Sequence, residues 1–250
     1  MRLSERDITT FARDGYVVLS GFFGAADMAK IAAWTDELEA MPEVPGRHWV
    51  YREDSLTAPG KRIIQRIENF YPFHAAFAAF LDGPLRALAD ALFGEPAVLF
   101  KDKINFKKPG GDGFKPHQDQ QAGWGTYAEL FITAMVSIDA STTENGCLEF
   151  APGQHKRGLI GEEWKPLTPA EMEGMTFKAY PTMPGDVVLF DSYAPHQSGP
   201  NRTGKERRIL YITYNRRSAG DHRLRYYADK HKNLPPDIER EPGKTYVFRV

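Results

Sequence analysis

The first hundred residues carry the spacing of amphipathic helices. Residues 25–41 have apolar side chains every three or four positions, and Pro42 stops the pattern. This spacing predicts a helix with one buried face. The members of that face are Met28, Ile31, Trp34 or Thr35, and Leu38. Shorter helices are predicted after Ser4, which can form a capping box with Asp7, and over residues 83–94.

Beyond Ala97 the pattern changes to short apolar runs separated by glycine, proline and asparagine. The runs occupy residues 97–106, 129–139, 147–152, 175–180, 186–191 and 207–215. Strands at this spacing, with turn sequences such as Asn145-Gly146 between them, predict a sandwich or barrel. A jelly roll is the simplest such fold that encloses a pocket between two sheets. We therefore expect a mainly β, cupin-like jelly roll buttressed by N-terminal helices.

The chain is expected to form one domain over residues 1–250. No repeat, low-complexity segment or linker interrupts the sequence, and 250 residues with 42% hydrophobic side chains can bury a large core. We expect the helices to concentrate in residues 1–95 and the jelly-roll core to occupy residues 96–218. Residues 43–60 show no periodic pattern and are expected to form a long loop.

Composition narrows the class of protein. The single cysteine, Cys147, excludes an internal disulfide and a zinc site built from several thiolates. The N-terminus lacks the apolar core of a signal peptide, and no apolar run reaches the roughly 18 to 20 residues of a membrane helix. We expect a cytoplasmic protein with no membrane partner.

The distribution of charge suggests an anionic ligand. A formal net charge of -1 argues against a general nucleic-acid-binding protein. Residues 201–225 nevertheless carry eight Lys or Arg against two acidic residues, and residues 101–115 carry five Lys. If these segments meet in the fold, they favour an anionic small molecule; the alternative is that they are solvated loop charges. The sequence does not indicate an oligomeric state.

His117 and Asp119 are the first candidates for chemistry. On a strand, positions i and i+2 share a face, so this pair presents a nitrogen and an oxygen ligand with Gln118 turned away. A third ligand is available at His196, just past an apolar run. Two histidines and one carboxylate form the facial triad of non-heme Fe(II) oxygenases. The alternative is that these histidines are hydrogen-bonded structural residues.

An arginine pair follows the second histidine. Arg207 and Arg208 begin a predicted strand, so one of them faces inward. A buried guanidinium needs an anionic partner. The distal carboxylate of 2-oxoglutarate can accept two parallel hydrogen bonds from such a group. The alternation alone leaves open which arginine this is.

Five segments of the chain resemble the phytanoyl-CoA dioxygenase family of Fe(II)- and 2-oxoglutarate-dependent oxygenases. They are FARDGYVVLSGFF, INFKKPGGDGFKPHQD, ENGCLEFAPGQH, PGDVVLFDSYAPHQSGPN and RRILYITYN, in the family's order and spread over nearly the whole chain. The resemblance implies a double-stranded β-helix, with O2 and 2-oxoglutarate as co-substrates and Fe(II) bound by His117, Asp119 and His196. It also implies that Ser198 and Arg207, two and eleven residues beyond the last histidine, hold the distal carboxylate of 2-oxoglutarate.

Further pocket residues are expected on two predicted strands and in the turn after Asp119. Candidates for contact with 2-oxoglutarate are Asn105, Lys103 and Thr133. Candidates for contact with substrate are Gln118, Trp124, Lys101 and Met135. The alternatives are that the lysines form an exposed edge and that Trp124 packs in the core. Relatives often carry Trp in place of Met135.

The predicted activity is hydroxylation of an unactivated C–H bond, with release of succinate and carbon dioxide. Relatives that halogenate replace the carboxylate ligand by a small residue, so the presence of Asp119 favours hydroxylation. The basic segments favour a small polar or anionic metabolite, such as a phosphonate or an amino acid. The alternatives are an acyl-CoA or natural-product hydroxylase of the same family, a zinc or manganese cupin-type hydrolase or isomerase, and a non-catalytic jelly-roll binding protein.

Overall fold

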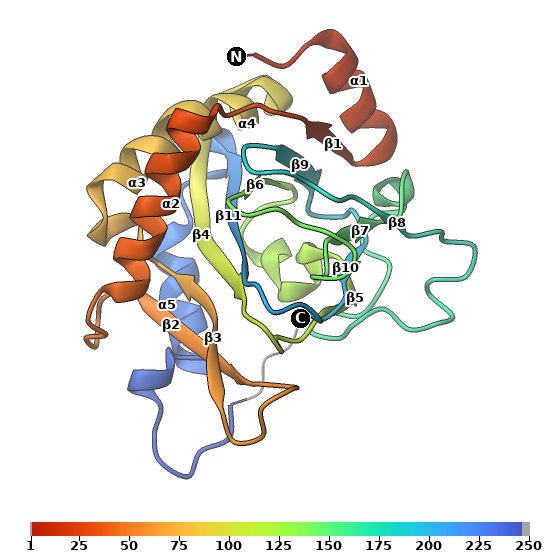
Figure 1. The fold of residues 1–250 in the computed structure, drawn as a ribbon. Coiled ribbons are helices and arrows are strands. Elements are labelled where there is room, and N and C mark those ends of the chain that lie inside the picture. Colours follow the sequence, from red (N-terminus) through yellow and green to blue (C-terminus); the bar gives the residue numbers. More distant parts are fainter. Residues whose placement is uncertain (1, 247–250) are drawn as a thin grey trace.

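Two antiparallel sheets pack together in the computed structural model, which describes residues 2–246 (Figure 1). Within these residues the larger sheet has seven strands in the order β1-β9-β6-β11-β4-β3-β2, and the smaller sheet has four in the order β5-β10-β7-β8. The larger sheet comprises β1 (Tyr16–Leu19), β2 (Trp49–Asp54), β3 (Arg62–Glu68), β4 (Ala97–Lys107), β6 (Phe131–Ser137), β9 (Val187–Asp191) and β11 (Arg207–Arg216). The smaller sheet comprises β5 (Phe114–His117), β7 (Leu148–Phe150), β8 (Lys178–Ala179) and β10 (His196–Ser198). The predicted mainly β jelly roll is confirmed.

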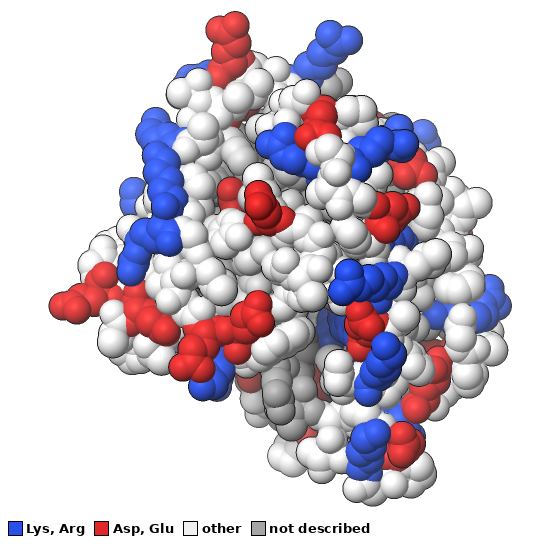
Figure 2. Space-filling model, turned by 180° about the vertical axis from the view of Figure 1, so that it is seen from behind, with Lys and Arg blue, Asp and Glu red and all other residues white. Residues whose placement is uncertain are grey.

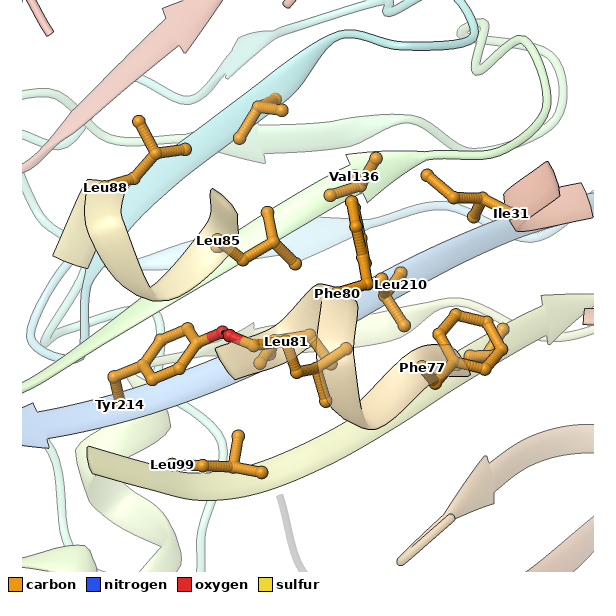
Figure 3. Close-up of a cluster of buried hydrophobic side chains, with 14 of the residues drawn as sticks. Ile31, Phe77, Phe80, Leu81, Leu85, Leu88, Leu99, Val136, Leu210 and Tyr214 are labelled. Carbon is orange, nitrogen blue, oxygen red and sulfur yellow. Dashed lines mark hydrogen bonds between the residues drawn. The ribbon is translucent and has the colours of Figure 1, made fainter. Parts of the chain in front are cut away.

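A layer of helices covers the outer face of the larger sheet (Figure 1). The layer consists of α2 (Ala25–Ala40), α3 (Ala75–Phe80), the π-helical turn Leu81–Leu85 and α4 (Arg86–Phe93), and α1 (Glu5–Asp14) packs against the same core through Phe11. Helix α5 (Arg223–Asn233) lies elsewhere, with Tyr226 and Tyr227 packed against Phe100 and Trp124. Figure 3 shows Phe80 and Leu85 of this layer directed toward Val136 of β6 and Leu210 of β11. All four side chains are buried, so the hydrophobic effect holds the helices on the sheet.

The predicted helix ends and faces are found in the first two helices. Ser4 and Asp7 form the capping box of α1. The buried residues of α2 are Met28, Ile31, Thr35 and Leu38. Thr35 is the buried alternative, and its hydroxyl donates a hydrogen bond to the Ile31 carbonyl at 2.8 Å, whereas Trp34 is partly buried against the same core.

Residues 43–60, predicted as a loop, contain strand β2. Strand β3 and helix α3 were also not predicted. Strand β2 pairs with β3 and packs against the far end of the chain. The Trp49 and Tyr227 rings lie 5.0 Å apart, and the Tyr51 hydroxyl donates to the Leu234 carbonyl at 2.8 Å. These partners lie about 180 residues away in sequence, so no local pattern reveals the strand. Helix α5 itself lies outside the region where helices were expected.

The fold places β4, β6 and β11 of the larger sheet opposite β5 and β10 of the smaller one, and the candidate site lies between them. The two basic segments of the sequence meet here, because β4 pairs with β11 along most of its length. Among residues 2–246, no helix is both long enough and apolar enough to span a bilayer.

Candidate active site

Three potential metal ligands converge between the sheets. His117 ends β5 and pairs in register with His196, which begins β10. Oδ1 of Asp119 lies 3.9 Å from Nε2 of each histidine, and one ligand atom from each of the three residues lies within 4.8 Å of the others. Asp119 opens a 3-10 turn instead of continuing the strand, but Gln118 keeps extended dihedral angles (φ -108°, ψ 136°). The i, i+2 alternation therefore brings His117 and Asp119 together as predicted.

Backbone carbonyls orient both imidazole rings. Nδ1 of His117 lies 2.7 Å from the Lys115 carbonyl oxygen, and Nδ1 of His196 lies 3.0 Å from that of Ala194. Because a carbonyl oxygen only accepts, each Nδ1 carries the proton and each Nε2 lone pair is available on the side of Asp119. Metal-binding histidines are oriented in this way.

The protonation states of the three side chains suit a divalent cation. Burial, followed by the neighbouring His196, lowers the pKa of His117 to about 3, and burial also lowers the pKa of His196. Burial alone would raise the pKa of Asp119, but its neighbours His196, His117 and Lys103 lower it overall. At neutral pH the site therefore offers two neutral imidazoles and one carboxylate, the forms that bind metal. This donor set fits Fe(II).

The three candidate ligands line a pocket between the two sheets. Five of the residues predicted for co-substrate or substrate contact line it: Lys101, Lys103, Asn105, Trp124 and Thr133. Apolar walls come from Phe114, Leu148 and Phe190. Tyr211 and Thr213 of β11 also line the pocket and were not predicted, although they share the inward face of β11 with Arg207.

Two residues predicted as substrate contacts do not line the pocket. Gln118 is fully buried, and its side chain hydrogen-bonds to backbone groups on the opposite side of the chain from the ligands. Met135 shares a strand face with Thr133 but lies further along β6, in the apolar cluster between the sheets. The alternation correctly predicted the strand face of Met135, but it could not show that Met135 packs in the apolar core away from the pocket. Both predictions are corrected.

A second buried cationic group lies next to the pocket. Arg207 is 1% exposed and interacts with the pocket residue Tyr211. Nη1 of Arg207 donates to Ser141 Oγ at 3.2 Å, whereas Nε has no hydrogen-bond partner. Within residues 2–246, Arg207 forms no ion pair. Arg208 points the other way and binds Asp139, with Nε 2.8 Å from Oδ2, so Arg207 is the inward arginine.

Lys107 joins this group and was missed by the sequence reasoning. It pairs in register with Arg207, and its Nζ donates to Ser198 Oγ at 2.9 Å and to the Gly199 carbonyl at 2.6 Å. Burial, followed by the charge of Arg207, lowers the pKa of Lys107 to about 7. The signal was present, because Lys107 continues the alternation of Lys103 and Asn105 along β4.

A buried carboxylate lies behind the lysine wall of the pocket. Glu68 is fully buried and forms ion pairs with Arg66 (2.8 Å) and with Lys230 of α5. Burial would raise the pKa of Glu68, but Lys101, Lys230 and Arg66 together hold it below the ordinary value. Nζ of Lys101 also lies 5.8 Å from the centre of the Tyr226 ring on α5. Helix α5 therefore contributes to the charge balance of the pocket.

The charge on the molecular surface is more balanced than the charge of the pocket. Figure 2 shows one face, on which Lys and Arg are interspersed with Asp and Glu. Several basic residues of the predicted cationic segments are paired with acids: Arg208 with Asp139, Arg216 with Glu95, and Arg223 with Asp102. By contrast, neither Lys101 nor Lys103 forms a hydrogen bond or ion pair within residues 2–246. Burial, followed by the charge of Lys101, lowers the pKa of Lys103 to about 7.

Asp191, at the end of β9, gives a test of stability against pH. Burial raises the pKa of this carboxyl from 3.8 to about 6, with only the Tyr193 amide opposing. A raised carboxyl pKa stabilises the fold fully below about pH 4, and this contribution is lost as the pH rises through 6. Asp191→Asn removes the titration. Its free energy of unfolding relative to wild type should therefore be higher at pH 8 than at pH 5, by on the order of 1 kcal/mol in urea denaturation. A constant difference at the two pH values would contradict the prediction.

Comparison with known proteins gives consistent matches over nearly the whole chain. A family model described as phytanoyl-CoA dioxygenase (PhyH) matches residues 11–209. A 2-aminoethylphosphonate dioxygenase from uncultured bacterium HF130_AEPn_1 is 42% identical, over 95% of this chain and 91% of the relative. A methylphosphonate hydroxylase from Gimesia maris is 38% identical, over 93% of this chain and 88% of the relative. The crystal structure of EctD from S. alaskensis with 2-oxoglutarate and 5-hydroxyectoine matches with a TM-score of 0.72 and 25% identity, over 87% of this chain and 77% of that one.

Proposed function

This chain belongs to the phytanoyl-CoA dioxygenase (PhyH) family of Fe(II)- and 2-oxoglutarate-dependent oxygenases, and from that membership we propose that it hydroxylates a C–H bond of a small phosphonate. The observation that carries the proposal is the pair of lysine side chains, Lys101 and Lys103, in the pocket wall. They face aromatic rings and have no anionic partner in direct contact within the described chain. A phosphonate offers up to two negative charges and three acceptor oxygens to such a pair.

We assign the metal and the co-substrate to separate parts of the site. His117, Asp119 and His196 would hold Fe(II). Arg207 would bind the distal carboxylate of 2-oxoglutarate through its fork of donors. Lys107 pairs in register with Arg207 and hydrogen-bonds to Ser198, so both would lie beside that carboxylate. When bound, iron and 2-oxoglutarate supply the oxidising chemistry that reduces O2, releases succinate and carbon dioxide, and places one oxygen atom in the substrate.

The remaining residues orient the reactants and exclude water. Oδ1 of Asn105 is buried without a hydrogen-bond partner, which leaves the amide free to orient the co-substrate. Thr133 Oγ1 donates to Asp119 Oδ2 at 3.4 Å and would keep that carboxylate in place. Phe114 and Phe190 would keep water away from the reacting carbon.

We further infer that residues 1–250 act as one domain.

The charge of the pocket favours a phosphonate over the alternatives. The acyl chain of a CoA thioester would place apolar carbon against the Lys101 and Lys103 side chains. A zinc or manganese hydrolase or isomerase leaves the buried Arg207 without a function. A non-catalytic binding protein has no need of three side chains in metal-binding form.

The proposed substrate class is tested by substrate-stimulated succinate release. Protein loaded anaerobically with Fe(II) and 2-oxoglutarate would be exposed to O2 with methylphosphonate, 2-aminoethylphosphonate, L-proline or an acyl-CoA. We expect a phosphonate to stimulate succinate release and to yield a hydroxylated product visible by 31P NMR. Strongest stimulation by the acyl-CoA or by L-proline would contradict the phosphonate assignment while leaving the oxygenase class intact.

Lys101→Met should weaken the use of the phosphonate specifically. Loss of a charge-assisted contact worth about 1.5–3 kcal/mol corresponds to a rise of roughly 10- to 100-fold in the KM for phosphonate. The KM for 2-oxoglutarate should change much less. Lys115→Met is the matched control, because Lys115 is exposed on β5 and should leave both KM values unchanged. An unchanged phosphonate KM in Lys101→Met would remove this residue from the substrate site.

A further inference from the structure

Gln118 lies between two of the proposed ligands, yet its side chain points away from them. It is fully buried, and its carboxamide makes three hydrogen bonds to backbone groups. Nε2 donates to the carbonyls of Gly158 and Tyr193, each at 2.7 Å, and Oε1 accepts from the Ile160 amide at 2.7 Å. Both donors of the amide group are therefore used at short distance.

One of these bonds joins the two segments that carry the ligands. Gln118 separates His117 from Asp119, and Tyr193 precedes His196 by three residues. The direct pairing of β5 with β10 is short, with a register irregularity between His196 and Ser198. Outside the strand ladder, the Gln118 carboxamide thus provides a side-chain connection between these segments, beside the backbone bond from the Gln120 amide to the Ser192 carbonyl (3.0 Å). The same side chain also attaches the loop at Gly158 and Ile160.

We propose that Gln118 is a positioning residue for the metal: its carboxamide fixes the separation of the His117–Asp119 segment from the His196 segment. The inference rests on the proposed role of the three ligands. Because a metal ion demands ligand positions within a few tenths of an ångström, a bond that fixes their spacing affects affinity without touching the ion. Loss of supporting hydrogen bonds of this kind typically weakens metal binding by roughly 10- to 100-fold.

Gln121 provides a matched control within the same turn. It is also fully buried, and its Nε2 donates to the carbonyls of Glu162 (2.9 Å) and Lys165 (2.7 Å), while its Oε1 accepts from the Gln118 amide at 2.8 Å. Like Gln118, Gln121 therefore makes three side-chain hydrogen bonds, two of them to the loop at residues 158–165. None of these bonds reaches the segment that carries His196.

The test compares Gln118→Met with Gln121→Met, since methionine keeps the length of the side chain and removes its hydrogen bonds. Fe(II) affinity would be measured anaerobically against a competing chelator, and Co(II) would serve as a spectroscopic probe of the ligand geometry. Thermal unfolding without metal would measure the structural cost of each change. We expect similar losses of thermal stability, a fall of roughly 10- to 100-fold in Fe(II) affinity for Gln118→Met only, and an altered Co(II) visible spectrum in that variant.

Wild-type Fe(II) affinity in Gln118→Met, or equal losses in both variants, would overturn the proposal. His117→Ala separates this outcome from failure of the proposed function. If wild type and His117→Ala bind Fe(II) equally, the metal assignment fails; if they differ and Gln118→Met resembles wild type, only the positioning role fails. Should Gln118→Met not fold, Gln118→Asn, which is one methylene shorter, is compared with Gln121→Asn by the same criterion.

Discussion

Asp119→Ala is expected to abolish substrate-dependent succinate formation, with a loss of roughly a thousandfold or more, to the background rate. Asp119 is the only carboxylate of the proposed triad, and its Oδ1 lies 3.9 Å from Nε2 of both His117 and His196. Removing it leaves two neutral imidazoles with no negative charge to balance a divalent cation. Succinate release and Fe(II) retention would be measured together, and both should fall.

The matched control is Asp191→Asn, which also removes a buried carboxyl group. Asp191 is not among the candidate ligands, so this variant should retain Fe(II) and turnover. Near-normal turnover in Asp119→Ala would refute the metal site as assigned. Loss of turnover with full Fe(II) retention would instead move the role of Asp119 from metal binding to a later step.

The second large effect is expected from Arg207→Met, which should raise the KM for 2-oxoglutarate by roughly 100-fold or more. The Arg207 guanidinium is 1% exposed, its Nε has no partner, and it has no ion pair within the described chain. A dicarboxylic acid that loses such a partner must leave a charge buried and unpaired, which costs about 3–5 kcal/mol. The KM for the phosphonate should change little, because Lys101 and Lys103 are retained.

Arg208→Met is the control for this prediction. Arg208 is the adjacent residue on the same strand, but it binds Asp139 and Asp36 on the outer side of the sheet. Its replacement should lower stability slightly and leave both KM values unchanged. Initial rates at varied 2-oxoglutarate distinguish the two variants. If Arg208→Met raised the 2-oxoglutarate KM more than Arg207→Met, the inward assignment of Arg207 would be wrong.

The sequence was informative where the pattern is local. Alternation along β4 predicted that Lys101, Lys103 and Asn105 face one pocket, and the same rule brought His117 beside Asp119. Alternation alone could not choose between Arg207 and Arg208. The Asp139 carboxylate decides that choice, and it lies on the turn after a different strand.

What the sequence did not predict depends on contacts between distant segments. Strand β2 is held by β3 and by the C-terminal part of the chain, so residues 43–60 read as a loop. Met135 was assigned to the right face, but its depth is set by packing between the two sheets. The role of the Gln118 carboxamide depends on the Gly158 and Tyr193 carbonyls, which no spacing rule connects to it.

Helix α5 contributes to the charge of the pocket but supplies none of the candidate metal ligands. The proposed metal ligands are residues 117, 119 and 196. Lys230 and Tyr226 of α5 instead contact Glu68 and Lys101, behind and within the pocket wall. Exchange of this helix between relatives would alter the electrostatic selection of reactants and leave the ligand set unchanged. Substitutions in α5 can therefore change substrate preference without any change in the residues proposed to bind the metal.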